Sequence, residues 1–260
     1  MASPRGQRTA NPARIYDYLL GGTDNTRVER RAGDQLMAAK PGLRANVRAN
    51  RRFLARAVRY LAGQGVTQFL DIGTGLPTMD NTHEVAQRAS PAARVAYVDN
   101  DPIVVTTARA LLVSSPQGHV DFLQLDLRYP GIILNRARDV LDFTRPVAIM
   151  LLGILYMIPD EQDPWRIVSA LTGALPPGGY LAISHPASDI RAEESAAGAD
   201  VYREATGIPQ ANRSRDQVAG FFAGLTLVPP GVVPLNQWRP DEQEDPGLTI
   251  SSWAGVGIRP

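Results

Sequence analysis

The sequence of 260 residues contains no cysteine and only three histidines, His83, His119 and His185. Without cysteine the chain forms no disulfide, offers no thiolate to a metal and has no cysteine nucleophile. Three scattered histidines do not make a histidine-rich metal site, and we therefore expect no metal. The reactivity of this protein is expected to come from a cofactor.

Long hydrophobic runs are also missing. The longest uninterrupted apolar run covers residues 147–158 and contains Gly153, whereas a membrane-spanning helix needs about 20 residues. The first residues include arginines but no apolar stretch behind them, so they do not resemble a secretory signal. With 44% hydrophobic and 20% charged residues, the composition is that of a globular chain of one or two domains. We expect a cytoplasmic protein with no membrane partner.

The near balance of 27 basic and 26 acidic residues hides an uneven distribution. Residues 1–62 carry 13 basic and 4 acidic residues, which leaves 14 basic and 22 acidic residues for the remainder. A strongly basic segment like residues 1–62 is typical of a surface that binds nucleic acid or phosphate, or of a basic helical cap on an acidic body. The arginines of residues 44–59 have no interleaved aromatic residues except Phe53 and Tyr60, which lie near the apolar side. We therefore favour a solvated helix face and do not expect nucleic acid as a partner.

Helical patterns precede the first strand. One helix is predicted to begin at Asn11-Pro12 and end at Gly21-Gly22, and a second covers residues 24–39. A third begins at Leu43, with its apolar residues on one side. The other side is predicted to carry Arg44, Arg48, Arg51, Arg52, Arg56 and Arg59.

From residue 66 onward, apolar β-rich runs alternate with helical stretches. Strands are predicted at 66–72, 94–99, 120–125, 147–152, 179–184, 225–228 and near 248–257, and later helices at about 189–206 and at 214–223. This alternation predicts an α/β fold, a Rossmann-like doubly wound, seven-stranded and mostly parallel sheet. Residues 1–62 would form an N-terminal helical extension or cap, and residues 63–260 the Rossmann-like domain.

The first predicted strand ends in Asp71-Ile-Gly73-Thr74-Gly75. Glycine is needed where the backbone approaches a ligand or adopts a positive φ. Thr78 stands where a dinucleotide-binding fingerprint has its third glycine, so the pattern does not favour pyrophosphate binding. What remains, Asp-x-Gly-x-Gly, is similar to the loop of S-adenosylmethionine-dependent methyltransferases, in which the carboxylate reaches the amino-acid end of the cofactor, directly or through water. It is also common in tight turns.

Two more acids follow the next two strands. Asp99 ends the second strand, where a carboxylate is placed to accept hydrogen bonds from two ribose hydroxyls, whether of NAD or of S-adenosylmethionine. Asp126 follows the third strand, and together with the backbone N–H of Leu127 it suits the amine and ring nitrogen of adenine. The alternative for Asp126 is a helix cap, as we predict for Asp101 before Pro102. Because the carboxyl ends of parallel strands line one crevice, the three acids are expected to lie together.

Several longer segments of the chain form a distinctive set. They are Arg14-Ile-Tyr16-Asp17-Tyr18-Leu-Leu-Gly21-Gly22, Gly75-Leu-Pro-Thr-Met-Asp-Asn81-Thr-His83-Glu84, Tyr97-Val-Asp99-Asn-Asp-Pro, Asp126-Leu-Arg128, Pro159-Asp160-Glu-Gln-Asp-Pro164, Phe221-Phe-Ala-Gly-Leu, Pro230-Gly-Val-Val-Pro and Trp238-Arg-Pro. In these segments, and over nearly its whole length, the chain resembles an actinobacterial family of S-adenosylmethionine-dependent methyltransferases. The resemblance implies the class I methyltransferase fold and S-adenosylmethionine as cofactor, with no settled substrate. The chain departs from it at Thr23 and Thr26, where lysine and phenylalanine are expected, and at Tyr156, where histidine is usual.

The candidate site residues follow from the strand ends and from the resemblance. The N-terminal segment is predicted to close over the cofactor, with Tyr18 and Asn25 facing the crevice. Tyr156 is a candidate for the acceptor pocket, where it would bind the acceptor, contact the sulfonium or simply pack. His185 would be a general base for a hydroxyl acceptor, or a structural histidine. The expected cofactor contacts are Tyr18, Gly22, Asn25, Asp71, Gly73, Thr74, Gly75, Asp99, Asn100, Asp126, Leu127 and Leu152.

The leading hypothesis for function is methyl transfer from S-adenosylmethionine to an unidentified small-molecule acceptor. A non-catalytic protein that binds S-adenosylmethionine or nucleic acid is an alternative from another class. An NAD-dependent oxidoreductase is a second alternative, but the missing third glycine and the Asp71 carboxylate beside a pyrophosphate count against it. The oligomeric state is left open.

Overall fold

A central sheet organises the computed structural model, which describes residues 9–78, 80–242, 244–245 and 247–260. The strand order is β3-β2-β1-β4-β5-β8-β6, and β7 also pairs with β8. Strands β1 to β5 run parallel, while β8 runs antiparallel to β5, β6 and β7. The strands are β1 (Gln68–Ile72), β2 (Arg94–Asp99), β3 (His119–Gln124), β4 (Ala148–Leu152), β5 (Tyr180–Pro186), β6 (Thr226–Leu227), β7 (Val233–Pro234) and β8 (Ser252–Ile258).

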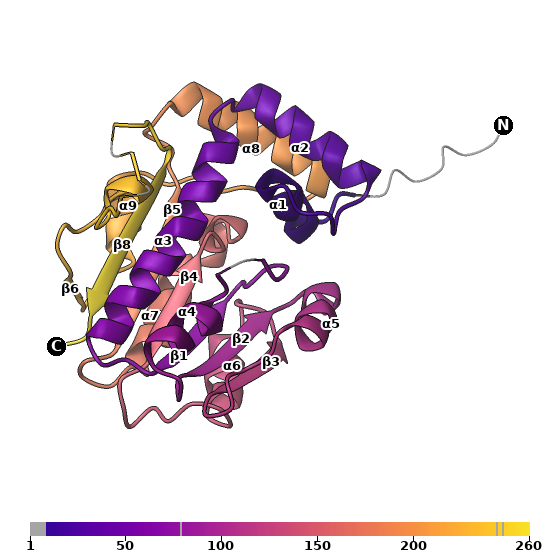
Figure 1. Ribbon diagram of the computed structural model, residues 1–260. Helices are drawn as coiled ribbons and strands as arrows, with labels where there is room; N and C mark the ends of the chain where they lie inside the picture. Colours follow the sequence, from indigo (N-terminus) through magenta and orange to yellow (C-terminus); the bar gives the residue numbers. More distant parts are fainter. Residues whose placement is uncertain (1–8, 79, 243, 246) are drawn as a thin grey trace.

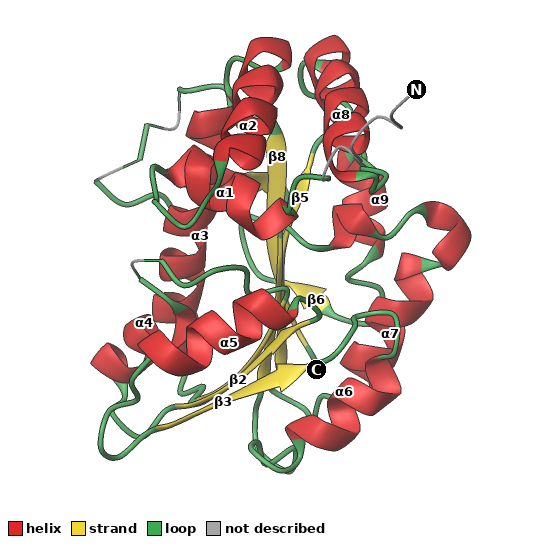
Figure 2. Ribbon diagram, turned by 90° about the vertical axis from the view of Figure 1, so that its right-hand side faces the viewer, coloured by secondary structure: helices red, strands yellow, loops and turns green. Residues whose placement is uncertain are grey.

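The predicted mostly parallel, doubly wound sheet is confirmed. The prediction has seven strands, and the described residues form eight; the strand that was not predicted is β7, a two-residue strand in a proline-rich segment. Helices α3 (Leu43–Gly63), α4 (Thr82–Ala89) and α5 (Pro102–Leu111) pack on one face, and α6 (Pro130–Ala137), α7 (Pro164–Gly173) and α9 (Arg215–Gly220) on the other. Figure 2 shows the sheet nearly edge-on between these two layers. Short 3-10 helices cover Leu155–Met157, Asp160–Gln162 and Leu235–Gln237.

A third group of helices lies above the carboxyl ends of the strands. It consists of α1 (Pro12–Leu20), α2 (Arg27–Ala39) and α8 (Ala192–Thr206), which share a small core of their own (Figure 1). Asn11 caps α1, and α1 ends before Gly21, whose φ is +92°. Helix α2 begins three residues later than predicted, because Thr26 is its N-cap and forms a capping box with Glu29.

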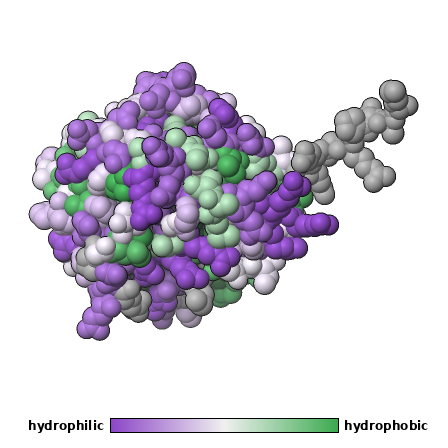
Figure 3. Space-filling model, turned by 90° about the horizontal axis from the view of Figure 1, so that it is seen from above, coloured by the Kyte–Doolittle hydropathy of each residue, from purple (hydrophilic) through white to green (hydrophobic). Residues whose placement is uncertain are grey.

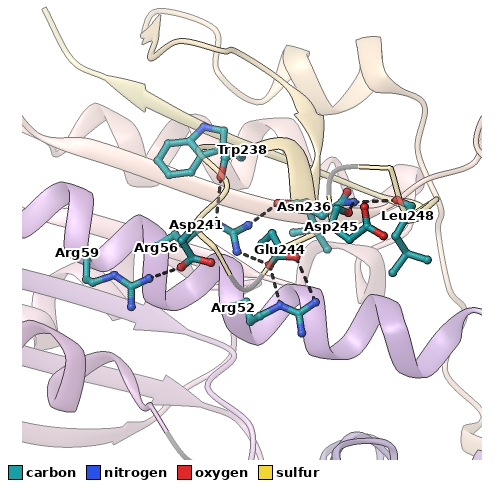
Figure 4. A network of polar contacts seen from close by, with 10 residues as sticks. Arg52, Arg56, Arg59, Asn236, Trp238, Asp241, Glu244, Asp245 and Leu248 are labelled. Atoms are coloured by element: carbon teal, nitrogen blue, oxygen red, sulfur yellow. Dashed lines mark hydrogen bonds and ion pairs between the residues drawn. The ribbon is translucent and has the colours of Figure 1, made fainter.

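The arginines of α3 bind an acidic loop near the C-terminus. Arg52 Nε donates to Glu244 Oε1 at 2.8 Å, and Arg56 donates to the same carboxylate and to two backbone carbonyls of residues 235–238. Arg59 forms a more exposed pair with Asp241 (Figure 4). The prediction of a solvated helix face is wrong for Arg56, which is 4% exposed. The alternative, a basic segment that lies on an acidic body, describes these contacts.

The upper surface is mainly hydrophilic. Seen from above, over α1, α2 and α8, hydrophilic side chains cover most of the molecule, and hydrophobic ones gather in small areas between them (Figure 3). Among the described residues, the structure contains no helix with the length and apolar character needed to cross a membrane.

Candidate functional site

The carboxyl ends of β1, β2 and β3 and the loop after β4 surround a cavity of about 440 Å³, called here the first cavity. It lies where a doubly wound sheet is expected to bind its ligand. Helix α1 covers it from above. Of the predicted cofactor contacts, those on the strand ends all line this cavity: Asp71, Gly73, Thr74, Gly75, Asp99, Asn100, Asp126, Leu127 and Leu152.

The glycine loop turns sharply beside the first cavity. Gly73 and Gly75 have φ values of +79° and +65°, in the left-handed region that favours glycine. A Cβ added to Gly73 would lie 2.5 Å from the Ile154 side chain, so this position has no room for one. The Gly75 N–H donates to Asp99 Oδ2 at 3.0 Å, which joins the loop to the end of the second strand.

Asp99 is held by backbone donors but keeps accepting capacity. Its Oδ1 accepts from the Asp101 N–H at 3.0 Å, and its Oδ2 accepts from Gly75. Burial raises the pKa of Asp99, and these backbone hydrogen bonds oppose that rise. Each carboxylate oxygen has two lone pairs, so both can accept one more hydrogen bond from a ligand. Asp99 is therefore a fixed acceptor for two adjacent hydroxyls.

Asp71 and Arg51 lie at another part of the first cavity. Asp71 is 5% exposed and accepts from Thr82 Oγ1 at 2.6 Å. Burial raises the pKa of Asp71 to about 6, although Thr82 and the positive charge of Arg51 lower it. A carboxylate near a guanidinium offers sites of opposite charge to a zwitterion, with its ammonium at Asp71 and its carboxylate at Arg51.

The prediction that Arg51 lies on the basic side of α3 is wrong, because Arg51 lines the first cavity. It follows Val47 by four residues and precedes Leu54 by three, which places it on the apolar side of the helix. That side faces the sheet, and Leu54 lines the first cavity together with Arg51. The spacing of Arg51 from Val47 and Leu54 was therefore the signal in the sequence that could have identified it as a residue of the cavity.

Asp126 is fixed by its own loop. Its Oδ1 accepts from the Arg128 N–H at 2.9 Å, and its Oδ2 pairs with Arg128 Nη1 at 2.9 Å. Helix α6 starts later, with Tyr129 at its N-cap position, so the helix-cap alternative for Asp126 is wrong. The predicted cap at Asp101 is confirmed, because Asp101 Oδ1 accepts from the Ile103 N–H at 2.8 Å.

The first turn of α1 covers the mouth of the first cavity, and it does so with other residues than predicted. Pro12, Ala13 and Tyr16 line the cavity. Asn11 Nδ2 donates to Asp101 Oδ2 at 2.5 Å, while Asn11 Oδ1 caps α1 by accepting from the Arg14 N–H. One side chain thus joins the start of α1 to the loop after β2.

Tyr18, Gly22 and Asn25 do not line the first cavity, and the prediction that Tyr18 and Asn25 face it is wrong. Residues two apart on a helix point about 200° apart, so Tyr16 faces inward and Tyr18 outward. The Tyr18 hydroxyl donates to an exposed carboxylate of α2 at 2.7 Å, and Asn25 Nδ2 donates to Asp17 Oδ2 at 2.8 Å. An added Cβ on Gly22 would lie 1.9 Å from Asp17 Oδ1. This glycine therefore serves the close turn after α1.

A second cavity, of about 120 Å³, adjoins the first at the carboxyl ends of β4 and β5. The two cavities have in common a set of lining residues that we call the shared wall: Pro12, Tyr16, Asn50, Gly153 and Tyr156. The Tyr156 ring lies 5.7 Å from that of Tyr202, centroid to centroid. Burial raises the pKa of Tyr156 to about 12, so its hydroxyl stays protonated at neutral pH and is not a base.

His185 lines the second cavity but is engaged within the protein. Its Nε2 lies 2.9 Å from Arg213 Nη1 and its Nδ1 2.9 Å from the Pro186 carbonyl oxygen. Because a guanidinium nitrogen only donates, Nε2 accepts and Nδ1 carries the hydrogen. Burial lowers the pKa of His185 to about 3. With its lone pair occupied, His185 fits the structural role and not that of a general base.

Comparison with known proteins agrees with this geometry. The S-adenosyl methyltransferase family matches residues 5–260, and no curated protein matches the chain. A DUF574 family protein from Streptomyces avermitilis is 41% identical with a TM-score of 0.93, covering 97% of this chain and 98% of that chain. A putative methyltransferase from Thermobifida fusca is 41% identical with a TM-score of 0.88, covering 96% and 95%. The plantazolicin methyltransferase BamL, solved with a triazolic desmethylPZN analog and SAH, shares the fold at 13% identity and a TM-score of 0.54, covering 95% of each chain.

Proposed function

The chain belongs to the S-adenosyl methyltransferase family, and from that premise we propose that it transfers the methyl group of S-adenosylmethionine to a small-molecule acceptor. The observation that carries the proposal is the set of three acids, Asp71, Asp99 and Asp126, around one cavity beside the glycine loop. When bound, the cofactor supplies an electrophilic methyl group: an acceptor lone pair forms the new bond to carbon, the electrons of the broken S–C bond stay on sulfur, and any acceptor proton passes to water.

The acids at the ends of β2 and β3 would hold the nucleoside. The carboxylate of Asp99, held by backbone donors, keeps accepting capacity that suits the two ribose hydroxyls. Asp126, with its carboxylate fixed by Arg128, would accept from the adenine amine, and the Leu127 N–H would donate to a ring nitrogen. These roles need no movement of the strands, because all three residues already line the first cavity.

The amino-acid part of the cofactor would lie at Asp71 and Arg51. The ionised Asp71 would accept from the ammonium, and Arg51 would donate to the carboxylate. Burial that raises the pKa of Asp71 to about 6 still leaves it mostly ionised at neutral pH. Binding of the ammonium would favour the ionised form further.

The acceptor would approach through the shared wall, where Tyr156 and Gly153 separate the two cavities. Neither Tyr156, with its raised pKa, nor His185, with its occupied lone pair, is suited to remove a proton. We infer that the protein contributes chiefly by holding the acceptor in line with the methyl group, and alignment of this kind can supply several kcal/mol of the barrier.

Binding of S-adenosylmethionine and S-adenosylhomocysteine to Asp99→Ala tests the proposal by isothermal titration calorimetry. Asp99→Ala loses two hydrogen bonds to a charged acceptor, each of which contributes about 1.5–3 kcal/mol, so the affinity for both ligands should fall about 100-fold or more. Asp139→Ala is the matched control, because Asp139 forms only an exposed pair with Arg136 and should bind as the wild type does. An Asp99→Ala protein that is folded by circular dichroism and binds within threefold of the wild type would refute the assignment.

A further inference from the structure

Lys40 is the single lysine among the 27 basic residues of the chain. It follows α2, is 5% exposed, and lines the second cavity but not the first. Its stem packs on α8, since a Cβ added to Gly198 would lie 3.6 Å from Lys40 Cβ and 3.7 Å from Lys40 Cδ. The other 26 of these basic residues are arginines, so this position holds the chain's one lysine ammonium at the wall of a cavity.

The ammonium of Lys40 has no direct partner within the described ranges of the chain: no carboxylate forms an ion pair with it, and it donates no hydrogen bond. Glu194 on α8 acts on it only at longer range, and Glu194 Oε1 pairs with Arg191 at 3.3 Å. Burial lowers the pKa of Lys40 to about 8, while Glu194 opposes the shift. Lys40 is 5% exposed, and a cation held largely out of bulk water without a carboxylate partner is costly, which points to a group that arrives with a ligand.

The rest of the second cavity offers little to another charge. Its apolar lining comes mainly from α1, α2 and α3. Its asparagine and serine side chains bond to one another: Asn50 Oδ1 accepts from Ser184 Oγ at 2.6 Å, and Asn46 Oδ1 accepts from Ser252 Oγ at 3.3 Å. The hydroxyl of Tyr202, also in the lining, is buried without a hydrogen-bond partner among the described residues and is a neutral group that a ligand could use. The apolar lining includes Ile15, Leu19, Leu36, Leu43 and Val47. The second cavity is thus a small apolar chamber with one cation.

We infer that the second cavity receives the methyl acceptor, and that the acceptor is a small carboxylic acid whose carboxylate pairs with Lys40. This inference rests on the proposed function, which places the methyl donor in the first cavity. The shared wall lies between them, so an acid held by Lys40 directs its opposite end toward the donor. A cavity of about 120 Å³ is smaller than the apolar cavity of about 150 Å³ that holds benzene, so it accommodates a short branched chain, or a ring that extends past the shared wall toward the first cavity.

The transfer would take place at the end of the acid remote from Lys40. A hydroxyl oxygen or amine nitrogen there uses its lone pair to bond the methyl carbon. The electron pair of the S–C bond remains on sulfur, and the proton of the hydroxyl or amine leaves to water. The carboxylate is not methylated, because its charge is needed at Lys40.

Lys40 is the group of the second cavity that titrates between pH 7 and pH 9. Burial raises the pKa values of the tyrosines in the lining and lowers that of the histidine, so these groups stay neutral throughout this range. The titratable and charged groups that face Lys40 or line its cavity are Glu194, Tyr16, Tyr156, Tyr202 and His185. Acid binding that requires the protonated lysine should therefore weaken about tenfold from pH 7 to pH 9.

The test uses benzoate, 4-hydroxybenzoate and 3-methylbutanoate, each against its own carboxamide, titrated into protein saturated with S-adenosylhomocysteine at pH 7. We expect at least one acid to bind tenfold or more tightly than its amide. Lys40→Met should remove that preference, and Arg48→Met, which removes an exposed charge from α3, should keep it. Both variants should bind S-adenosylhomocysteine as the wild type does. The wild-type pH series measures the same dependence without any substitution.

Three outcomes would overturn the inference while leaving the proposed function intact. In the first, each acid binds with the same affinity as its amide. In the second, none of the three acids shows saturable binding. In the third, folded Lys40→Met binds the acid as tightly as the wild type does. Each is recognisable because S-adenosylhomocysteine still binds. If the wild type binds no S-adenosylhomocysteine, the proposed function fails and this inference fails with it.

Discussion

Replacing Lys40 by methionine should stabilise the ligand-free protein. Burial lowers the pKa of Lys40 from its usual 10.5 to about 8. A pKa difference of one corresponds to about 1.36 kcal/mol, so the protonated lysine reduces the free energy of unfolding by about 3 kcal/mol at pH 7. Lys40 is only 5% exposed, so solvent screening removes little of this effect.

The increase in the free energy of unfolding caused by Lys40→Met should become smaller as the pH rises. Below pH 8 the lysine is charged in both folded and unfolded protein, and the folded state bears the whole penalty. Between pH 8 and pH 10.5 the folded protein loses the proton first, so the wild type becomes relatively more stable. The advantage of Lys40→Met should therefore be about 3 kcal/mol at pH 7 and should shrink as the pH approaches 10.5.

Urea unfolding followed by circular dichroism at pH 7, 8.5 and 10 measures this difference. The methionine side chain adds a hydrophobic contribution at every pH, so the pH-dependent part is the informative one. Arg48→Met, in which the charge removed is exposed, should show no such dependence. A Lys40→Met protein that is less stable at pH 7, or whose gain does not change with pH, would refute the account of Lys40.

Three further predictions concern the cofactor site and its supports. Burial raises the pKa of Asp71 to about 6, and the ammonium of the cofactor needs the ionised carboxylate. The affinity for S-adenosylmethionine should therefore fall about tenfold from pH 7 to pH 5 in a calorimetric series. An Asp71→Asn protein whose affinity changes with pH as that of the wild type does would contradict this. Asn11→Ala removes both the cap of α1 and the hydrogen bond from Asn11 to the loop after β2, and it should lower the affinity for S-adenosylmethionine about tenfold. Asn25→Ala, a change outside the lining of the first cavity, should leave this affinity unchanged. Equal affinities of the two variants would show that the contact of α1 with the loop after β2 does not support cofactor binding. Arg56→Met leaves the buried carboxylate of Glu244 with Arg52 as its one remaining arginine partner among the described residues and removes the donor to two backbone carbonyls. It should lower the free energy of unfolding by about 3 kcal/mol in urea titrations, against less than about 1 kcal/mol for Arg59→Met at its exposed pair. Similar losses in the two variants would refute the distinction.

Much of the fold and the strand-end part of the site could be predicted from local patterns. The parallel strands are short β-rich segments that alternate with helical patterns, and the three acids stand at or just after their carboxyl ends, so the topology brings Asp71, Asp99 and Asp126 together. The cap at Asp101 was equally local. These features depend on neighbours in the sequence, and the structure places them as expected.

The residues that were missed depend on the orientation of helices. Tyr16 and Tyr18 are both aromatic, and the sequence does not state which side of α1 turns toward the sheet. Lys40 stands before a proline and a glycine, as at an ordinary helix end, and its burial comes from α8, more than 150 residues later. Arg56 is paired with a carboxylate 188 residues away. Contacts between distant segments of this kind leave no local pattern.

The most direct test of the central claim is a transfer assay with isotopically labelled S-adenosylmethionine and a small-molecule extract from an actinobacterium, read by mass spectrometry. The wild type should form S-adenosylhomocysteine in equal amount to a labelled small carboxylic acid, and Asp99→Ala should form neither. Tight binding of the cofactor without S-adenosylhomocysteine formation in any fraction would contradict the claim and identify a binding protein instead of a methyltransferase.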